Sequence, residues 1–342
     1  MATQPAARPF FDRDSVFDRD LAHRRLQNLV TAGGLVLDRQ SDPERISVAG
    51  CGFQAAAAVD IPHPDRPAIA EQLTEQLDRL VRGNPAANGG WFSHFTDRDG
   101  LPIVGSEVST IDTALLLAGH RVAARVLRDP NHAALLDRVA GDVDLAMVTV
   151  DGWISHGFRW PELHGVGDRE PIAHLWKDTS ECALLYWLFG ERMIREGLRR
   201  GPWEPEIVRT DYPLFVYVYP LCFDDRPNDP GQRHRWRSLL IECLERQRSE
   251  FGVVGQTATD GPDGYSVGSP SVVAPVLLAA LAGDPGLPHV RESLERLRSR
   301  GIDPMAMCHD VDSGWTGDDV ISIDIGSAIL AARAIRERGE LR

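Results

Sequence analysis

The sequence WFSHFTDRDGLPIVGSEVSTIDTALLLAG occupies residues 91–119. Aromatic residues surround a histidine at its start, a polar turn follows, and a run of Leu and Ala ends it. The run predicts a largely buried helix over residues 107–127, which ends before Pro130 because proline cannot continue a helix. Glu107 and Asp112 lie at the start of this helix, where side chains meet solvent or a ligand. We therefore expect the other segments to form helices that hold this helix start in place.

The chain of 342 residues is acidic, with 37 Lys and Arg against 50 Asp and Glu and a formal net charge of −13. Such a surface repels nucleic acid and anionic membranes, so we expect neither as a partner. It suits an uncharged or cationic small-molecule or oligosaccharide substrate. The sequence has no apolar run of the roughly 18 residues that span a bilayer, and its first residues lack the apolar core of an export signal. We expect residues 1–11 to be a flexible tail and the protein to be cytoplasmic.

Cysteine spacing and short motifs bear on metals and cofactors. The five cysteines are widely spaced, which predicts buried thiols rather than a disulfide framework or a zinc site. The sequence contains no phosphate-binding loop and no glycine-rich dinucleotide pattern. The Asp-rich residues 310–319 lack the residue order of a calcium-binding EF-hand loop. We therefore expect no cofactor and no metal ion.

Helical periodicity predominates along the chain, and long strand alternation is absent, which argues against a parallel sheet. We expect about twelve helices, joined by loops of unequal length. No fixed repeat is found, so a closed ring of helical hairpins is favoured over an open solenoid. No linker composition interrupts the chain, so we expect one domain over residues 1–342. The predicted helices include residues 12–32, 47–59, 66–82, 107–127, 131–147, 173–189, 191–199, 232–249, 272–282, 288–300 and 321–336.

Carboxylates recur beside aromatic residues in segments that are far apart in the sequence. They are Glu107 with Asp112, Glu181, Asp260 with Asp263, and Asp324. Glycoside cleavage requires two carboxyl groups that face each other across a pocket, one to protonate the leaving oxygen and one to attack or to activate water. Trp and Tyr rings stack on the apolar faces of sugars. This combination of residues is typical of a sugar-cleaving site.

Each of these residues also has an ordinary structural explanation. Acids at a helix start are favoured by the helix dipole alone, so Glu107 by itself is weak evidence. Asp260 and Asp263 are common turn residues, and an isolated Trp is more often part of the core. Glu181 is harder to explain, because an unpaired buried carboxylate is costly. It needs either a partner, for which Lys177 is placed four residues earlier, or a function.

Four motifs in this order look familiar: GLVLDR at residues 34–39, SEVSTIDTALLLAG at 106–119, ATDGPDGY at 258–265 and SIDIG at 322–326. With them the chain resembles the bacterial glucoamylase-like domain family, over about residues 26–334. That family includes endo-acting β-1,2-glucanases and the transglycosylase-type domain of cyclic β-1,2-glucan synthases. The resemblance implies an all-α fold, an (α/α)6 toroid with short β segments in its loops.

The resemblance also implies action on β-linked glucans, with Glu181 and Glu107 as the catalytic carboxylates. Two departures from the family pattern stand out: residues 217–219 are Tyr-Val-Tyr where Gln and His are usual, and Ile-Gly follows Asp324 where Gln-Gly is usual. The residues expected to bind substrate are Asp38, Arg39, Trp91, His94, Asp112, Trp160, Trp176, Tyr217, Asp260, Asp263, Tyr265, Trp315 and Asp324.

Three functional hypotheses follow from these observations. The leading one is a glycoside hydrolase or transglycosidase that acts on a β-glucoside or a short β-glucan. The second uses the same pocket for an acid-dependent cyclase or lyase reaction on a metabolite, which the departures from the family pattern motivate. The third is a sugar-binding or scaffold protein without turnover.

Overall fold

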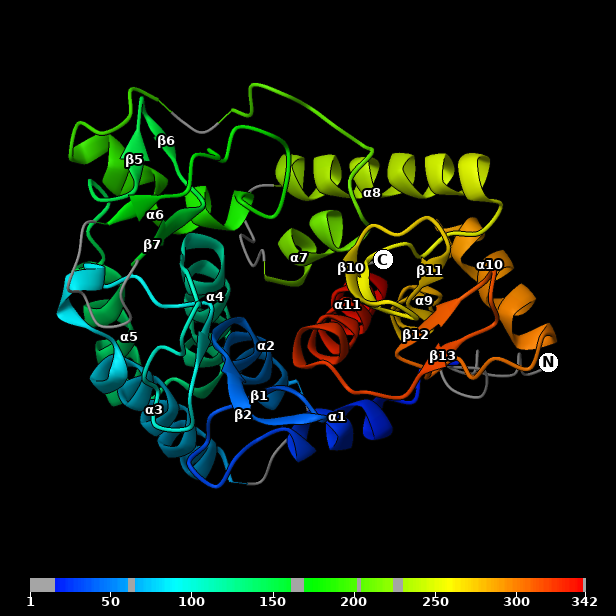
Figure 1. Ribbon diagram of the computed structural model, residues 1–342, viewed down its shortest axis with the longest axis horizontal. Helices are drawn as coiled ribbons and strands as arrows, with labels where there is room; N and C mark the ends of the chain where they lie inside the picture. Colours follow the sequence, from blue (N-terminus) through cyan, green and yellow to red (C-terminus); the bar gives the residue numbers. More distant parts are fainter. Residues whose placement is uncertain (1–15, 61–64, 161–168, 202–203, 224–229, 341–342) are drawn as a thin grey trace, which may run out of the picture.

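The computed structural model describes residues 16–60, 65–160, 169–201, 204–223 and 230–340 (Figure 1). The predicted flexible tail, residues 1–11, lies outside them. The described chain contains eleven α-helices and thirteen short strands, so the prediction of a mainly helical fold with short β segments in its loops is confirmed. The helices are α1 Arg19–Asn28, α2 Val48–Ala58, α3 Arg66–Gly83, α4 Thr110–Leu127, α5 Pro130–Asp142, α6 Ala183–Arg195, α7 Phe215–Phe223, α8 Pro230–Phe251, α9 Pro275–Leu281, α10 Pro288–Ser299 and α11 Ser322–Glu340.

Helix α2 packs against both α4 and α11, and α11 also contacts α7 and α9 (Figure 1). Glycines allow the closest approach. A β-carbon built at Gly52 would lie 2.2 Å from the carbonyl oxygen of Leu115, and one at Gly119 would lie 1.8 Å from that of Gly52. Any larger side chain at Gly52 or Gly119 would therefore force α2 and α4 apart. The remaining helices pack around this group: α3 pairs with α5, α6 packs on α4, α8 on α7, α10 on α9 and α1 on α11.

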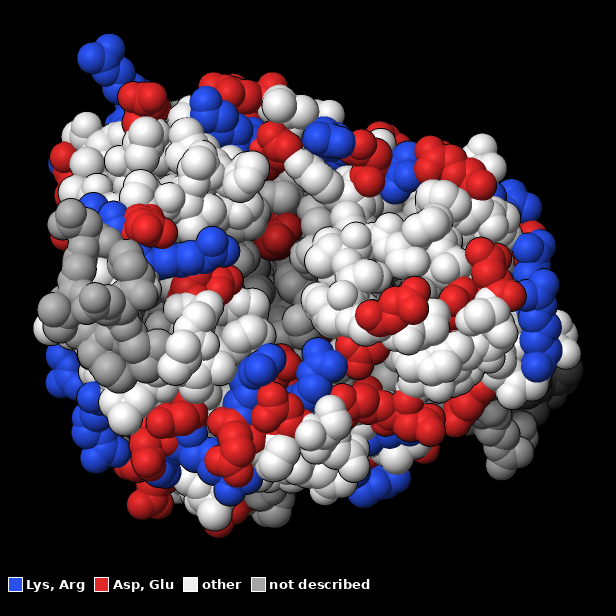
Figure 2. All heavy atoms as spheres, viewed as in Figure 1, with Lys and Arg blue, Asp and Glu red and all other residues white. Residues whose placement is uncertain are grey.

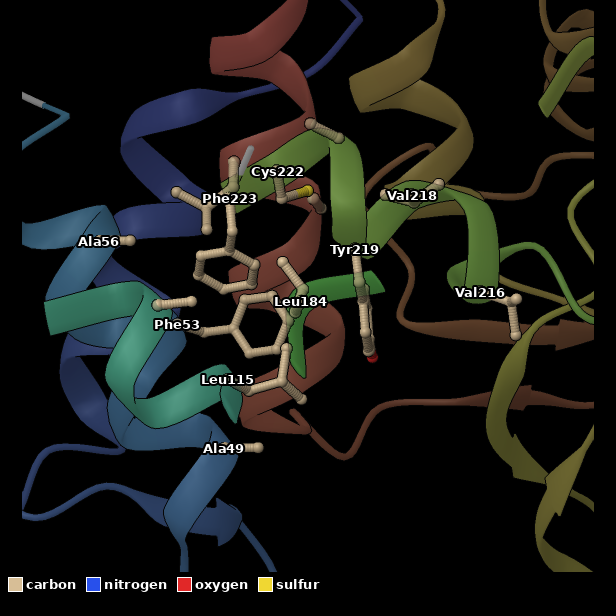
Figure 3. Packing of buried hydrophobic residues seen from close by; sticks show 14 of the residues in the cluster. Ala49, Phe53, Ala56, Leu115, Leu184, Val216, Val218, Tyr219, Cys222 and Phe223 are labelled. Carbon is tan, nitrogen blue, oxygen red and sulfur yellow. The ribbon is translucent and has the colours of Figure 1, made fainter. Parts of the chain in front are cut away.

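The buried apolar residues form one main cluster that extends from Phe17 to Ala332. Phe53 of α2 lies in its middle, with ring centroids 5.0 Å from both Tyr219 and Phe223 of α7 (Figure 3). All five cysteines are buried thiols, as their spacing predicted. In the described ranges, no helix combines the length and the apolar character needed to cross a membrane.

Short antiparallel sheets connect the helix starts. Their strands are β1 Leu37–Arg39, β2 Asp42–Ser47, β3 Phe95–Thr96, β4 Val108–Ser109, β5 Thr149–Val150, β6 Trp153–Ile154, β7 Gly157–Arg159, β8 Glu170–Pro171, β9 Ala258–Gly261, β10 Gly264–Val267, β11 Val272–Val273, β12 Cys308–Asp310 and β13 Thr316–Gly317. Ser47 pairs with Phe95, so the sheet of β1, β2 and β3 runs directly into α2. An isolated bridge joins Arg39 to Ile321, one residue before α11. These pairings bring the starts of α2 and α11 together.

Several helix bounds differ from the sequence prediction. Helix α1 spans Arg19–Asn28 where residues 12–32 were predicted, and α6 continues to Arg195, so residues 191–199 do not form a separate helix. Helix α4 begins at Thr110 rather than at Glu107, because Ser109 caps it by accepting a hydrogen bond from the backbone N–H of Asp112. Helix α6 begins at Ala183, although residues 173–189 were predicted as helical. Backbone bridges hold Leu175 against Ser155 and Asp178 against Ile207, so that segment is extended and the helix starts only after it.

Candidate active site

Four buried carboxyl groups come together from separate parts of the chain. Asp112 and Asp324 lie in the first turns of α4 and α11, Glu181 lies just before α6, and Asp38 lies in β1. Their residues are only 6–9% exposed. Asp112 lies near enough to raise the pKa of Glu181, and Asp38 near enough to raise that of Asp324. We refer to Asp38, Asp112, Glu181 and Asp324 as the acidic cluster.

The molecular surface is hollowed near the centre of the face shown in Figure 2. In the matching view of Figure 1 this hollow lies between α4 and α7. Acidic side chains lie at its edge and inside it. A concave site with convergent polar groups is the usual setting for ligand binding and catalysis.

Glu181 has a carboxyl group that the fold leaves uncompensated. Burial, together with the charge of Asp112, raises the pKa of Glu181 to about 7. Its Oε2 atom is enclosed and has no hydrogen-bond partner within the described chain. Lys177, the partner suggested by the sequence, forms an ion pair with Glu206 at 3.4 Å instead. A carboxyl group of this kind can hold and release a proton near neutral pH.

Asp324 is the second carboxyl group whose pKa burial raises to about 7, with further contributions from Asp260 and Asp38. Thr259 in β9 donates a hydrogen bond of 2.8 Å to its Oδ2 atom. The acidic cluster thus contains two carboxyl groups poised to change protonation state near neutrality. Both lie at a helix start, where the helix dipole partly offsets the cost of charging them.

His94 lies between two acids. Its Nδ1 atom is 3.0 Å from Oε1 of Glu107, and its Nε2 atom is 3.6 Å from Oδ1 of Asp112. Burial disfavours the imidazolium, but Asp112 and Glu107 outweigh it and raise the pKa of His94 to about 9. The hydrogen bond from His94 in turn lowers the pKa of Glu107. Glu107 is therefore an ionised partner of His94, and it does not cap α4.

Arg39 contacts Asp38, another acid of the cluster. It donates a hydrogen bond of 3.2 Å to Asp38 and contacts both carboxylate oxygens of Asp260 at 3.0 Å. Asp319 lies 3.8 Å away, and the ring of Tyr265 lies 6.0 Å from the guanidinium. The adjacent pair of Asp38 and Arg39 is thus one part of a larger network. Because this network engages the guanidinium, Arg39 is poorly suited to receive an anionic ligand.

Tyr219 lies beside the acidic cluster but was not among the residues predicted from the sequence. Burial raises its pKa well above the ordinary value, and Asp324, Tyr265 and Glu181 contribute further. Residues 217–219 depart from the family pattern, and Tyr217 was the one expected to bind substrate. Residues two positions apart on an α-helix are separated by about 200° around its axis. Tyr217 and Tyr219 therefore face opposite sides of the helix. Only the tertiary structure shows which side faces the acids.

The prediction that Trp91 and Tyr217 bind substrate is corrected, because both residues are 0% exposed. Trp91 donates its indole N–H to the carbonyl oxygen of Asp144 at 2.9 Å and packs edge-on against Phe189. The Tyr217 hydroxyl donates to the carbonyl oxygen of Arg209 at 2.9 Å. Neither side chain offers a surface on which a sugar could lie.

Other predicted site residues have contacts outside the acidic cluster. Asp263 lies exposed in the turn between β9 and β10. Trp160 donates a hydrogen bond to Asn88 at 2.9 Å, and Trp315 lies against Gly317. Trp176 donates to the Thr110 hydroxyl at 3.0 Å and so supports the start of α4. The residues gathered at or next to the cluster are Asp38, Arg39, His94, Glu107, Asp112, Glu181, Tyr219, Asp260, Tyr265 and Asp324.

Solved structures resemble this chain over nearly its whole length. A glucoamylase-like protein from Bacteroides uniformis aligns over 96% of this chain and 93% of its own, with a TM-score of 0.69 and 17% identity. An endo-β-1,2-glucanase from Chitinophaga pinensis, in complex with sophorotriose and glucose, aligns over 95% and 93%, with a TM-score of 0.67 and 14% identity.

The chain shares the fold of these proteins. A β-1,2-glucanase from Parabacteroides distasonis also matches, with a TM-score of 0.68 and 15% identity, over 94% of this chain and 56% of that longer one. Neither a protein-family model nor a curated protein sequence matches the chain. The fold implied by the resemblance of the sequence motifs is thus shared with these structures, at low sequence identity.

Proposed function

We propose that the protein is a glycoside hydrolase or transglycosidase that acts on a β-glucoside or a short β-glucan. One observation carries the proposal: Glu181 is a buried carboxyl group of pKa about 7, without a hydrogen-bond partner at Oε2 within the described chain, beside a second buried acid. A structural carboxylate in such a position would be expected to have a compensating partner. The fold shared with β-1,2-glucanases supports the choice of sugar.

The overall architecture that we propose is a single domain in which the helices close into an (α/α)6 toroid. The inner helices would be α2, α4, α6, α7, α9 and α11. The contacts of α2 with α4 and α11, of α4 with α6, of α6 with α7 and of α11 with α9 support this order. The pocket would then lie at the end of the ring where α4, α6 and α11 begin.

In the proposed mechanism, protonated Glu181 donates its proton to the glycosidic oxygen as the bond to the anomeric carbon breaks. A second carboxylate attacks that carbon or activates water. From the sequence, Glu107 was expected to be this second carboxylate. We now propose Asp112 for it, because the charge of Asp112 affects the pKa of Glu181, while Glu107 forms a hydrogen bond with His94. Glu107 would keep His94 protonated and so favour the ionised form of Asp112.

The remaining residues of the site would bind the sugar. Asp38, Asp260 and Asp324 offer carboxylate oxygens to sugar hydroxyl groups, and Tyr265 offers a ring face. Arg39 would hold Asp38 and Asp260 in position through the contacts described above. Uncharged hydroxyl groups suit this arrangement better than phosphate or carboxylate groups, which the surrounding acids would repel.

The decisive experiment replaces Glu181 by Gln and measures turnover of sophorose and a panel of β-glucosides. General acid catalysis contributes about 10²–10⁴-fold, so a loss of that size is expected. Glu206→Gln is the matched control, because Glu206 is an exposed acid paired with Lys177 and should leave turnover unchanged. Unchanged turnover in Glu181→Gln would remove the assignment. Product mass separates hydrolysis, which adds water, from a cyclase reaction, which leaves the mass unchanged.

The choice of the second carboxylate is tested in parallel with Asp112→Asn and Glu107→Gln. If Asp112 acts on the substrate, its substitution should reduce turnover about as much as that of Glu181. Glu107→Gln should be milder and should lower the pKa of His94, measured by NMR titration. The reverse order of the two losses would restore the assignment made from the sequence.

A further inference from the structure

The hydroxyl group of Tyr219 has no hydrogen-bond partner among the described residues, although the residue as a whole is buried. The residue is 5% exposed. Its hydroxyl oxygen is not one of the enclosed side-chain atoms that lack a partner, so the oxygen is open to solvent or a ligand while the ring is buried. The contrast on the same helix is direct: the Tyr217 hydroxyl donates to the carbonyl oxygen of Arg209 and accepts from the backbone N–H of Tyr212. The missing partner at Tyr219 therefore calls for an explanation.

The ring of Tyr219 is held firmly, so its hydroxyl group has a defined direction. Phe53 packs edge-on against it with ring centroids 5.0 Å apart, and Phe215 packs at 5.2 Å. Figure 3 shows the side chain extending from α7 with its oxygen at the end away from Phe223. Two rigid aromatic neighbours fix the phenol in place before any ligand binds, which lowers the entropic cost of using it.

The surroundings of the hydroxyl group point to the acidic cluster. Asp324, Tyr265 and Glu181 all lie near enough to raise the pKa of the phenol. The phenol thus remains protonated and is a hydrogen-bond donor at physiological pH. Glu181, whose charge contributes to the raised pKa of the phenol, has an Oε2 atom that also lacks a partner within the described chain. An unpaired donor and an unpaired carboxyl oxygen in one place complement an alcohol group, which can accept from one and donate to the other.

We propose that Tyr219 is a substrate-binding residue that donates a hydrogen bond to a hydroxyl group of the sugar beside Glu181. This inference rests on the proposed function for the identity of the ligand. It also adds to that function, because it assigns to α7 a specificity-determining contact. The hydroxyl group on the ligand must be uncharged, since an anion would be repelled by Asp324 and Glu181. Tyr219 orients the substrate, and the proton is still supplied by Glu181.

The test compares Tyr219→Phe with the matched variant Tyr217→Phe, using sophorose as the probe. Tyr219→Phe should weaken sophorose binding and raise KM by about ten- to a hundredfold, with a smaller change in kcat. Its unliganded Tm should not fall, because no hydrogen bond within the described chain is lost. Tyr217→Phe should show the opposite pattern, a Tm lower by a few degrees with unchanged KM, because it leaves two backbone groups unpaired.

A second measurement uses methyl β-glucosides that each lack one ring hydroxyl group. For one of them, the affinity lost by the wild type should disappear in Tyr219→Phe, because the partner of the missing group is already absent. Equal sophorose affinity in wild type and Tyr219→Phe would overturn the inference, as would the absence of sophorose binding by the wild type. Binding that depends on Tyr219 without any hydrolysis would instead sink the proposed function alone. Hydrolysis that needs Glu181 but is indifferent to Tyr219→Phe would sink the present inference alone.

Discussion

Asp60 and Glu181 are both buried acids, and the fold treats them in opposite ways. The Asp60 side chain is 2% exposed and lies beyond the carboxyl end of α2, opposite the end that Ser47 caps. Arg19, His23 and Arg336 contact it at 3.0, 3.3 and 2.9 Å. Burial alone would raise the pKa of Asp60, but the hydrogen bond with His23 and the charges of Arg336 and Arg19 outweigh it and lower the pKa. Among the described residues Glu181 has no such cationic partner, and its pKa rises to about 7.

The difference distinguishes a structural carboxylate from one kept for chemistry. At Asp60, Arg19 from α1 and Arg336 from α11 compensate the buried charge, and this links two helices that are far apart in the sequence. At Glu181 the cost of burial is left uncompensated, and a protein retains such a cost where activity requires it. The comparison predicts opposite responses to the same type of substitution.

The largest expected effect is on stability in Asp60→Asn. The substitution removes the negative charge that Arg19 and Arg336 contact, so the free energy of unfolding should fall by roughly 3 kcal/mol at pH 7. Because the pKa of folded Asp60 is lowered, its contribution is present above the unfolded pKa of about 3.8 and is lost as pH falls through the folded value. Urea unfolding should show a smaller difference in unfolding free energy between wild type and Asp60→Asn at about pH 3 than at pH 7. Equal stability at pH 7 would refute the compensated-charge account.

Glu181→Gln should change the free energy of unfolding in the opposite direction and raise it. The pKa of Glu181 is about 7 in the folded chain against 4.5 in the reference state, so charging it opposes folding as pH rises from 4.5 to 7. The neutral Gln avoids that cost and should raise the free energy of unfolding by roughly 2 kcal/mol at pH 8, with little change at pH 4. Urea unfolding of wild type and variant at both pH values checks this. A loss of stability at pH 8 would mean that Glu181 has an ionic partner after all.

Arg39→Lys should cost about 1 kcal/mol of unfolding free energy, because lysine cannot reproduce the contacts of a guanidinium with several carboxylates. Arg19→Lys at the Asp60 site is the matched variant. It should cost less, since His23 and Arg336 still contact Asp60. Chemical unfolding of the two variants ranks them, and the reverse order would contradict the role of Arg39 as the cation shared by Asp38 and Asp260.

The smallest expected effect concerns His94. Its pKa of about 9 lies above the ordinary histidine value of 6.5, so its contribution to stability is fully present below pH 6.5 and is lost as pH rises through 9. The side chain is 32% exposed, so we expect less than about 1 kcal/mol. His94→Gln should flatten the dependence of unfolding free energy on pH between about 7 and 10. NMR titration of the His94 ring should give the raised pKa directly, and a value near 6.5 would contradict the described contacts.

Much of the fold could be predicted from the sequence, because most helices are encoded locally. The small, apolar residues 47–59 predicted a closely packed helix, and α2 occupies Val48–Ala58. The amphipathic residues 66–82 correspond to α3, Arg66–Gly83. The failure at residues 173–182 has a nonlocal cause. Leu175 and Asp178 pair with Ser155 and Ile207, and these pairings override a helical pattern that is visible only along the chain.

The candidate site was less predictable. The acids were identified as Glu107, Asp112, Glu181 and Asp324, since carboxylates among aromatic residues are recognisable by type. The sequence could not show that Glu107 forms a hydrogen bond with His94, since that contact depends on how two extended segments lie side by side. It also led to Tyr217 where Tyr219 lies by the acids, because an apolar helix that is buried on all sides has no polar face to indicate its orientation.

Residue type and local spacing determined most of the helices of this chain, its acidity, and which of its side chains suit the proposed sugar cleavage. Only the tertiary structure decided which acidic side chains become buried and which of these acquire cationic partners. The sequence does not show which partners Asp60 and Glu181 acquire. Arg19 and Arg336 contact Asp60, whereas Oε2 of Glu181 has no hydrogen-bond partner among the described residues. The reason is physical: the pKa of a carboxyl group depends on the solvent and charges within a few ångströms, and distant segments supply them.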